Sequence, residues 1–299
     1  MDVDDFNFLL DKVQPLIQRK DTTLRKAITA RQRLSVSVLP HWKINNWPDC
    51  ETCEALCMVL KDHLKTPTTE AGWREVARGF QDRCQFPHCL GAIDGKHVYI
   101  QTPANSGSLF YNYKGRFSVV LMAVVDANYK FVYASVGTQG RMSDASLFGQ
   151  SDLRSAMDRG LLNVPKPEPL PNSNVIMPYI ARRTVENAFG ILANRLRVFL
   201  TNIALDPDKV TAITLAALSI HNFLREKGSE AYVPPAFVDT EDESHRLVFG
   251  TWRRGGALNS VALSRARNAT EQPAKEQRDQ LKAYFQSPAG SVYWQEDMI

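Results

Sequence analysis

The hydrophobic positions of the chain follow a helical spacing in its first third and a strand-like spacing further on. Apolar residues recur every three or four positions over residues 5–20 and 49–65. Residues 66–70 carry a proline, a threonine cap and an acid, which start a helix that runs to about residue 83. Segments 90–93, 98–101, 118–126 and 130–137 are short and rich in Val, Ile, Phe and Tyr. This order predicts a helical region followed by an antiparallel β-meander.

The remaining segments complete an α+β pattern. Asp21 and the threonines after it can cap a second helix to about residue 30, and residues 35–39 alternate like a short strand. Further predicted helices occupy residues 143–159, 182–200 and 208–226, with a proline-rich loop at 162–180. We therefore predict a helical N-terminal region (1–83), an α+β domain (84–228) and a basic, partly mobile C-terminal tail (229–299).

Composition narrows the class of protein. A net charge of +4 and a pI near 8.7 permit a polyanionic partner without requiring one. The acidic start of the chain lacks the basic residues of a secretory signal, and no apolar run is long enough to span a bilayer, so we expect an intracellular protein. Cys50, Cys53 and Cys57 share a helical stripe with Leu56 and Leu60, and we favour a buried helix face over a zinc site.

Two acids stand out as candidate functional residues. Asp94 lies within the strand-like segment CLGAIDGKHVYI, where Lys96 and His97 are suited to contact phosphate. Glu186 lies at the polar edge of a later helix, whose basic residues are also DNA-contact candidates: Arg182, Arg183, Arg195 and Arg197. Paired carboxylates can hold divalent metal ions for phosphoryl transfer. From the residues alone, Asp94 could instead belong to an Asp-Gly hairpin turn, and Glu186 could pair with a nearby arginine.

Three long motifs, GAIDGKHVYI, VVDANYKFVYASVGTQGRMSDASLF and ARRTVENAFGILANRLRVF, resemble PIF/Harbinger-type transposases and the nuclease-like proteins derived from them. The resemblance implies an RNase H-like fold and a DDE triad that uses Mg²⁺ or Mn²⁺ to cut DNA. Asp94 matches the first Asp of that triad and Glu186 matches its Glu, so both are expected to be catalytic residues and metal ligands. The resemblance also implies DNA and a Myb/SANT-like protein as partners, and a location in the nucleus, with the cytoplasm as a second location.

The chain departs from the family pattern in two places. The core strand that carries the second Asp is missing between the proline-rich loop and the Glu186 helix, and neither Asp126 nor Asp144 stands at its position. Most of a helix-turn-helix segment is also missing after residue 39. The chain is therefore either a partial form of a nuclease or a domesticated copy. We predict a metal-dependent DNA endonuclease of transposase origin that is impaired by the lost Asp, with a non-catalytic DNA- or chromatin-binding or protein-interaction role as the alternative.

Overall fold

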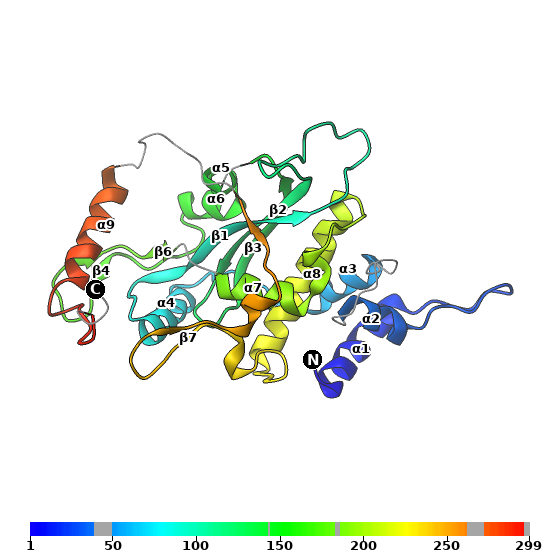
Figure 1. Ribbon diagram of the computed structural model, residues 1–299, viewed down its shortest axis with the longest axis horizontal. Coiled ribbons are helices and arrows are strands. Elements are labelled where there is room, and N and C mark those ends of the chain that lie inside the picture. The colour runs from blue at the N-terminus through cyan, green and yellow to red at the C-terminus, as the bar shows by residue number, and fades with distance from the viewer. Residues whose placement is uncertain (39–49, 143, 183–185, 262–271, 296–299) are drawn as a thin grey trace.

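A four-strand path in the order β3-β2-β1-β6, with β9 also paired to β1, forms the centre of the molecule (Figure 1). The computed structural model describes residues 1–299 except 39–49, 143, 183–185, 262–271 and 296–299. Strands β1 (Cys89–Tyr99), β2 (Ser118–Val125) and β3 (Phe131–Gln139) form an antiparallel meander. The short β6 (Ile180–Arg182) runs parallel to β1, and β9 (Asn259–Ser260) runs antiparallel to it. The predicted meander, and with it a mixed helix-and-sheet fold, is confirmed.

Strand β2 is buried along its whole length because both faces of the sheet are covered. Val119, Leu121 and Ala123 point into the main core, where α7 (Glu186–Arg195) and α8 (Pro207–Glu226) supply the opposing side chains. Val120 and Met122 point to the other face and pack with residues of α5 (Asp144–Gly149). An uninterrupted apolar run is therefore what this position requires, since alternating polar residues would be buried on one face.

The remaining helices extend these two layers. Helix α8 packs against β3, α3 (Cys50–Val59) packs against α8, and α1 (Val3–Ile17) packs against α3. Helix α4 (Glu70–Cys84) lies along β1, and its Trp73 joins the second core with α6 (Asp152–Asp158). Cys53, Leu56 and Leu60 are buried in the main core, as the predicted apolar stripe required. Figure 1 shows α1, α2 and α3 together beside α8.

The N-terminal region differs from the prediction in its second helix. Residues 21–29 are not helical, and α2 (Ala30–Val38) begins where the predicted helix was expected to end. Asp21 accepts a hydrogen bond from the Ala27 N–H at 2.7 Å, so its carboxylate closes a loop. Leu34 and Val38 then bury the apolar face of α2 in the main core. Residues 35–38 of the alternation at 35–39, which we had interpreted as strand-like, are part of this helix, and residue 39 lies outside the described residues.

Three further predicted elements have different boundaries in the structure. Residues 90–93 and 98–99 belong to one continuous strand, in which Asp94 pairs with Ala123 of β2, so the alternative of an Asp-Gly hairpin is wrong. The predicted helix at 143–159 is divided at Ser151, whose hydroxyl caps α6. Within the described residues, α7 spans Glu186–Arg195 and is followed by the 3₁₀ helix η1 (Arg197–Leu200). The expected cap at Ser143 and the shortened segment at 39–49 lie outside the described residues.

Part of the segment that we expected to be a tail belongs to the core. Strand β9 pairs with Lys96 and His97 of β1, and η3 (Thr251–Arg254) packs on α7. Gly190 of α7 allows this packing, because a Cβ at that position would overlap the Trp252 ring. The other elements are small or peripheral: β4 (Glu168–Pro169), β5 (Ile176–Met177), η2 (Pro235–Phe237), β7 (Thr240–Glu241), β8 (Leu247–Val248) and α9 (Gln272–Phe285).

Candidate functional site

Asp94 lies in the middle of β1 on the face of the sheet that α7 and α8 cover. Its cross-strand partner Ala123 and the next partner on that face, Leu121, both belong to the main core, which fixes this orientation. One carboxylate oxygen, Oδ1, accepts the N–H of Gly95 at 2.9 Å. The other, Oδ2, lies 2.8 Å from the ammonium nitrogen of Lys96. Both oxygens of the candidate catalytic acid are therefore engaged by the chain itself.

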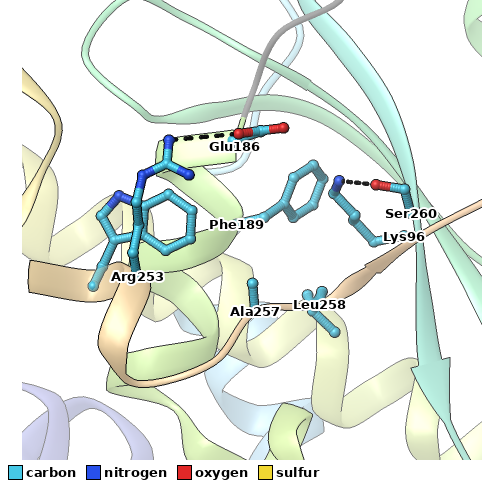
Figure 2. A pocket seen from close by; sticks show the side chains of 8 residues that line it. Lys96, Glu186, Phe189, Arg253, Ala257, Leu258 and Ser260 are labelled. Atoms are coloured by element: carbon cyan, nitrogen blue, oxygen red, sulfur yellow. Dashed lines mark hydrogen bonds and ion pairs between the residues drawn. The ribbon is translucent and has the colours of Figure 1, made fainter. Parts of the chain in front are cut away.

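Lys96 is an inward-pointing cation that faces three different groups. Its side chain is only 5% exposed, against 15% for Asp94. Besides Asp94, its Nζ donates to the Ser260 hydroxyl at 2.6 Å and lies 5.3 Å from the centre of the Phe189 ring. An ammonium group that is removed from water needs such partners to offset its lost hydration. Ser260 of β9 and Phe189 of α7, which Figure 2 shows beside Lys96, thus help to hold this lysine against Asp94.

Glu186 lies in the first turn of α7, where the helix dipole favours an acid. Its side chain is 59% exposed, and its Oε2 lies 3.6 Å from the Arg253 guanidinium. Arg253 donates two hydrogen bonds, at 3.0 and 2.6 Å, to the two carboxylate oxygens of Asp239. Burial alone would raise the pKa of Asp239, but the hydrogen bonds from Arg253 and the Gly250 N–H bring that pKa below its usual value. Arg253 is thus shared between two acids.

An open pocket of about 300 Å³ is lined by Glu186 and by Lys96, the cation that contacts Asp94. Figure 2 shows Glu186 and Arg253 on one side of it and Lys96 with Ser260 on the other, with Phe189 between them. The pocket is lined by Lys96, Glu186, Phe189, Trp252, Arg253, Ala257, Leu258 and Ser260. Its two cations are balanced by the acids that contact them, so the pocket itself carries no excess of positive charge.

The described residues at this site do not match a divalent-metal centre. Two-metal phosphoryl transfer needs several carboxylates around one point, with free oxygens directed at the ions. Asp94 has both oxygens engaged, and Glu186 is largely solvent-exposed beside Arg253. Strand β6, the parallel neighbour of β1, contributes Ile180, Ala181 and Arg182 and no acid. Within the described part of the chain, no three His, Cys, Asp or Glu side chains form a group that could hold a metal ion.

The predicted DNA-contact residues are spread over different environments. His97 is fully buried, and its Nδ1 lies 2.9 Å from the Ser118 hydroxyl. Burial lowers its pKa to about 4, so it is neutral at pH 7 and has no surface to present to a phosphate in this conformation. Arg195 is half-buried with its guanidinium 4.2 Å from the Phe237 ring, and Arg197 is exposed. Arg182 lies in β6, and Arg183 is outside the described residues.

Sequence reasoning missed the C-terminal side of the pocket. Trp252, Arg253 and Ser260 come from a segment whose pattern of apolar residues was too weak to predict a place in the core. The one available signal was the pair Arg253 and Arg254 following a tryptophan, which is also common on exposed surfaces.

Comparison with known proteins identifies the relationship. Residues 93–177, which include Asp94 and the meander, match the family described as DDE superfamily endonuclease. The chain is related to these endonucleases. Human "Putative nuclease HARBI1" is 24% identical over 205 residues, which cover 61% of this chain and 59% of that protein, and the Bos taurus protein of the same name gives the same figures. "Protein ALP1-like" from Arabidopsis thaliana is 28% identical over 88 residues, covering 29% of this chain and 22% of that protein.

These matches confirm the family relationship that the sequence motifs predicted. The chain spans about three fifths of the length of the HARBI1 relatives. The family match ends before Glu186, so the first predicted acid lies inside it and the second lies beyond it. No solved structure matches the chain significantly. In the parts of the chain that the structure describes, no helix is long and apolar enough to cross a membrane.

Proposed function

We propose that this chain is a nuclear DNA-binding protein descended from a DDE endonuclease, and that in this form it cuts DNA weakly or not at all. The observation that carries the proposal is the state of the two acids that match the family's catalytic residues. Asp94 is held by Lys96 and Glu186 faces Arg253, so each candidate metal ligand already has a cation of the protein beside it. An ion would have to displace Lys96 from Asp94 before that carboxylate could bind it.

We propose DNA as the partner because the related endonucleases belong to a family that acts on DNA. The excess of basic residues, +4 overall, suits a polyanion, and nucleic-acid binding needs only phosphate neutralisation and positioning rather than an intact triad. Residual endonuclease activity with Mg²⁺ or Mn²⁺ is the competing function, because Asp94 and Glu186 still lie on the same side of the sheet. A Myb/SANT-like protein partner stays a prediction of the resemblance.

Binding and cutting can be separated with the purified chain. We expect the affinity for a labelled 30-base-pair duplex to fall by about 10²-fold between 50 and 200 mM salt, the loss expected for about four phosphate contacts. We expect no Mg²⁺- or Mn²⁺-dependent nicking of a supercoiled plasmid above the level of Asp94→Ala. The measurements are fluorescence anisotropy and gel assay of nicked plasmid.

Two results would decide against the proposal. Metal-dependent nicking that Asp94→Ala abolishes would show an active nuclease. Affinity that is absent, or unchanged across this range of salt, would exclude DNA binding through phosphate contacts. Nicking that persists in Asp94→Ala would indicate a contaminating nuclease and leave the proposal standing.

A further inference from the structure

The connection between β1 and β2 presents a surface that neither the predicted triad nor the pocket uses. Residues 101–117 leave the end of β1, and their last part folds into a hairpin in which Tyr111 bridges Phe117. Figure 1 shows this connection as the teal loop that projects at the upper right, away from α9. We call residues 111–117 the aromatic hairpin.

The aromatic hairpin is held in one shape by Asn112, which is almost fully buried. The Asn112 Nδ2 donates to the Ser118 hydroxyl at 2.9 Å, and its Oδ1 accepts the N–H groups of Lys114 and Arg116 at 3.0 and 3.2 Å. Gly115 takes a positive φ of 75° at the turn, which a side chain would disfavour. The tip is therefore ordered before any ligand arrives, so binding costs little conformational entropy.

Two tyrosines of the aromatic hairpin expose much of their side chains. Tyr111 is 47% exposed and packs the edge of its ring on Phe117, with 5.2 Å between ring centres. Tyr113 is 60% exposed, and its hydroxyl donates to the backbone oxygen of Ser260 at 3.1 Å. The polar end of Tyr113 is thus anchored while its ring stays accessible. Large apolar surfaces fixed in this way are typical of binding sites rather than of ordinary exposed residues.

The charge of the same loop is entirely positive. Residues 101–117 include Lys114 and Arg116 and no acid. Lys114 lies 5.6 Å from the centre of the Tyr113 ring and donates to the Asn259 amide oxygen, and Arg116 stacks over Tyr99 and donates to the amide oxygen of Asn202. Among the described residues, no carboxylate forms an ion pair with either cation. Both therefore remain available to an anionic partner.

We infer that the aromatic hairpin binds an unpaired DNA strand, with bases stacked on Tyr113 and Tyr111 and phosphates beside Lys114 and Arg116. Accessible aromatic rings interleaved with unpaired cations suit single strands, because in a duplex the base faces are already stacked on one another. The inference rests on the proposed function, since it requires DNA as the partner. Ser260 joins the two regions: its carbonyl oxygen accepts from Tyr113 and its hydroxyl from Lys96. A strand bound here would pass close to the Asp94 site.

The test compares three labelled probes on the full chain by fluorescence anisotropy: a 15-mer of thymidylate, a 15-base-pair duplex and a 15-mer of uridylate. We expect Tyr113→Ala to weaken binding of the thymidylate strand by about 5- to 150-fold, the range for removing one stacking side chain, and to change duplex binding much less. Tyr113→Phe keeps the ring and should keep most of the affinity, although it loses the bond to Ser260. Tyr293→Ala removes another exposed tyrosine, near the C-terminal end of the chain, and should have no effect.

Each outcome bears on the inference. Equal losses for strand and duplex in Tyr113→Ala, or a loss as large in Tyr113→Phe, would overturn it, because stacking on the ring would then not be the cause. Tighter binding of the uridylate strand would show RNA as the ligand instead. Duplex binding without strand binding would refute this inference and leave the proposed function intact, whereas no binding of either DNA would remove both. Unchanged thermal unfolding of Tyr113→Ala confirms that the variant is folded.

Discussion

Replacing Lys96 by methionine should lower the free energy of unfolding by about 3 kcal/mol, the cost of removing one partner from a buried ion pair. Methionine fills the volume of the lysine stem, but the Asp94 carboxylate loses its cation in a part of the sheet where only 15% of its side chain reaches solvent. The Ser260 hydroxyl loses the same donor. Urea denaturation followed by circular dichroism measures the difference, and the slope with urea should stay unchanged.

Two companion variants show whether the loss comes from the ion pair. Adding Asp94→Asn to Lys96→Met removes the stranded charge and should recover most of the stability, which a double-mutant cycle would report as a coupling between the two positions. Lys65→Met breaks the exposed pair with Asp62, in which both side chains are more than 60% exposed, and should cost less than about 1 kcal/mol. If Lys96→Met costs no more than Lys65→Met, then Lys96 does not hold Asp94, and the reason for proposing impaired catalysis is lost.

The sequence predicted correctly those elements whose local signals, such as apolar runs and helix caps, match the burial that the fold requires of them. The run from Val119 to Val125 has to be buried on both faces, and both faces are covered. Helix α4 begins after the Thr69 cap as predicted, because that hydroxyl accepts the Gly72 N–H. Helix α8 is long and mostly apolar and is buried where β3 and α3 meet it.

The parts that the sequence did not predict depend on contacts between distant residues. Asp94 and Lys96 look like a break in a strand, but pairing with β2 and the support of Ser260, 164 residues further along the chain than Lys96, keep β1 continuous. Arg253 likewise reaches Glu186 from a distant part of the chain, 67 residues further along. Sequence alone named both acids of the candidate site. It could not show that each has a cation beside it, because nothing local to Ser260 or Arg253 indicates their place in the fold.

Acid should destabilise the protein through His221, and replacing this histidine should remove much of the effect. His221 is fully buried in α8, with its Nδ1 2.8 Å from the Tyr232 hydroxyl and its Nε2 2.7 Å from the backbone oxygen of Tyr129. The carbonyl can only accept, so Nε2 carries the proton and Nδ1 accepts from Tyr232 in the neutral ring. Burial, with a smaller contribution from the nearby Arg225 charge, lowers the pKa of His221 from 6.5 to about 3.

The direction of the pH effect follows from this shift. Between about pH 6.5 and pH 3 the unfolded chain binds a proton at His221 and the folded chain does not, so stability is complete above pH 6.5 and falls as pH falls. At pH 4.5 the loss from this one group should be about 3 kcal/mol relative to pH 7. Urea denaturation at pH 7, 5.5 and 4.5 gives the change in the free energy of unfolding with pH for the parent chain and for His221→Gln. The difference between the two proteins isolates His221 from the carboxylates that titrate in the same range.

Tyr232→Phe is the matched control, because it removes a hydrogen bond from the same cluster without removing the titrating group. It should lower stability at every pH and keep the steep fall between pH 7 and 4.5, whereas His221→Gln should lower stability at pH 7 and flatten that fall. Equal slopes for the parent chain and His221→Gln would mean that the folded protein accepts a proton at this position. That result would contradict the burial of His221 between Tyr129 and Tyr232. It would also contradict the packing of α8 against the β-meander.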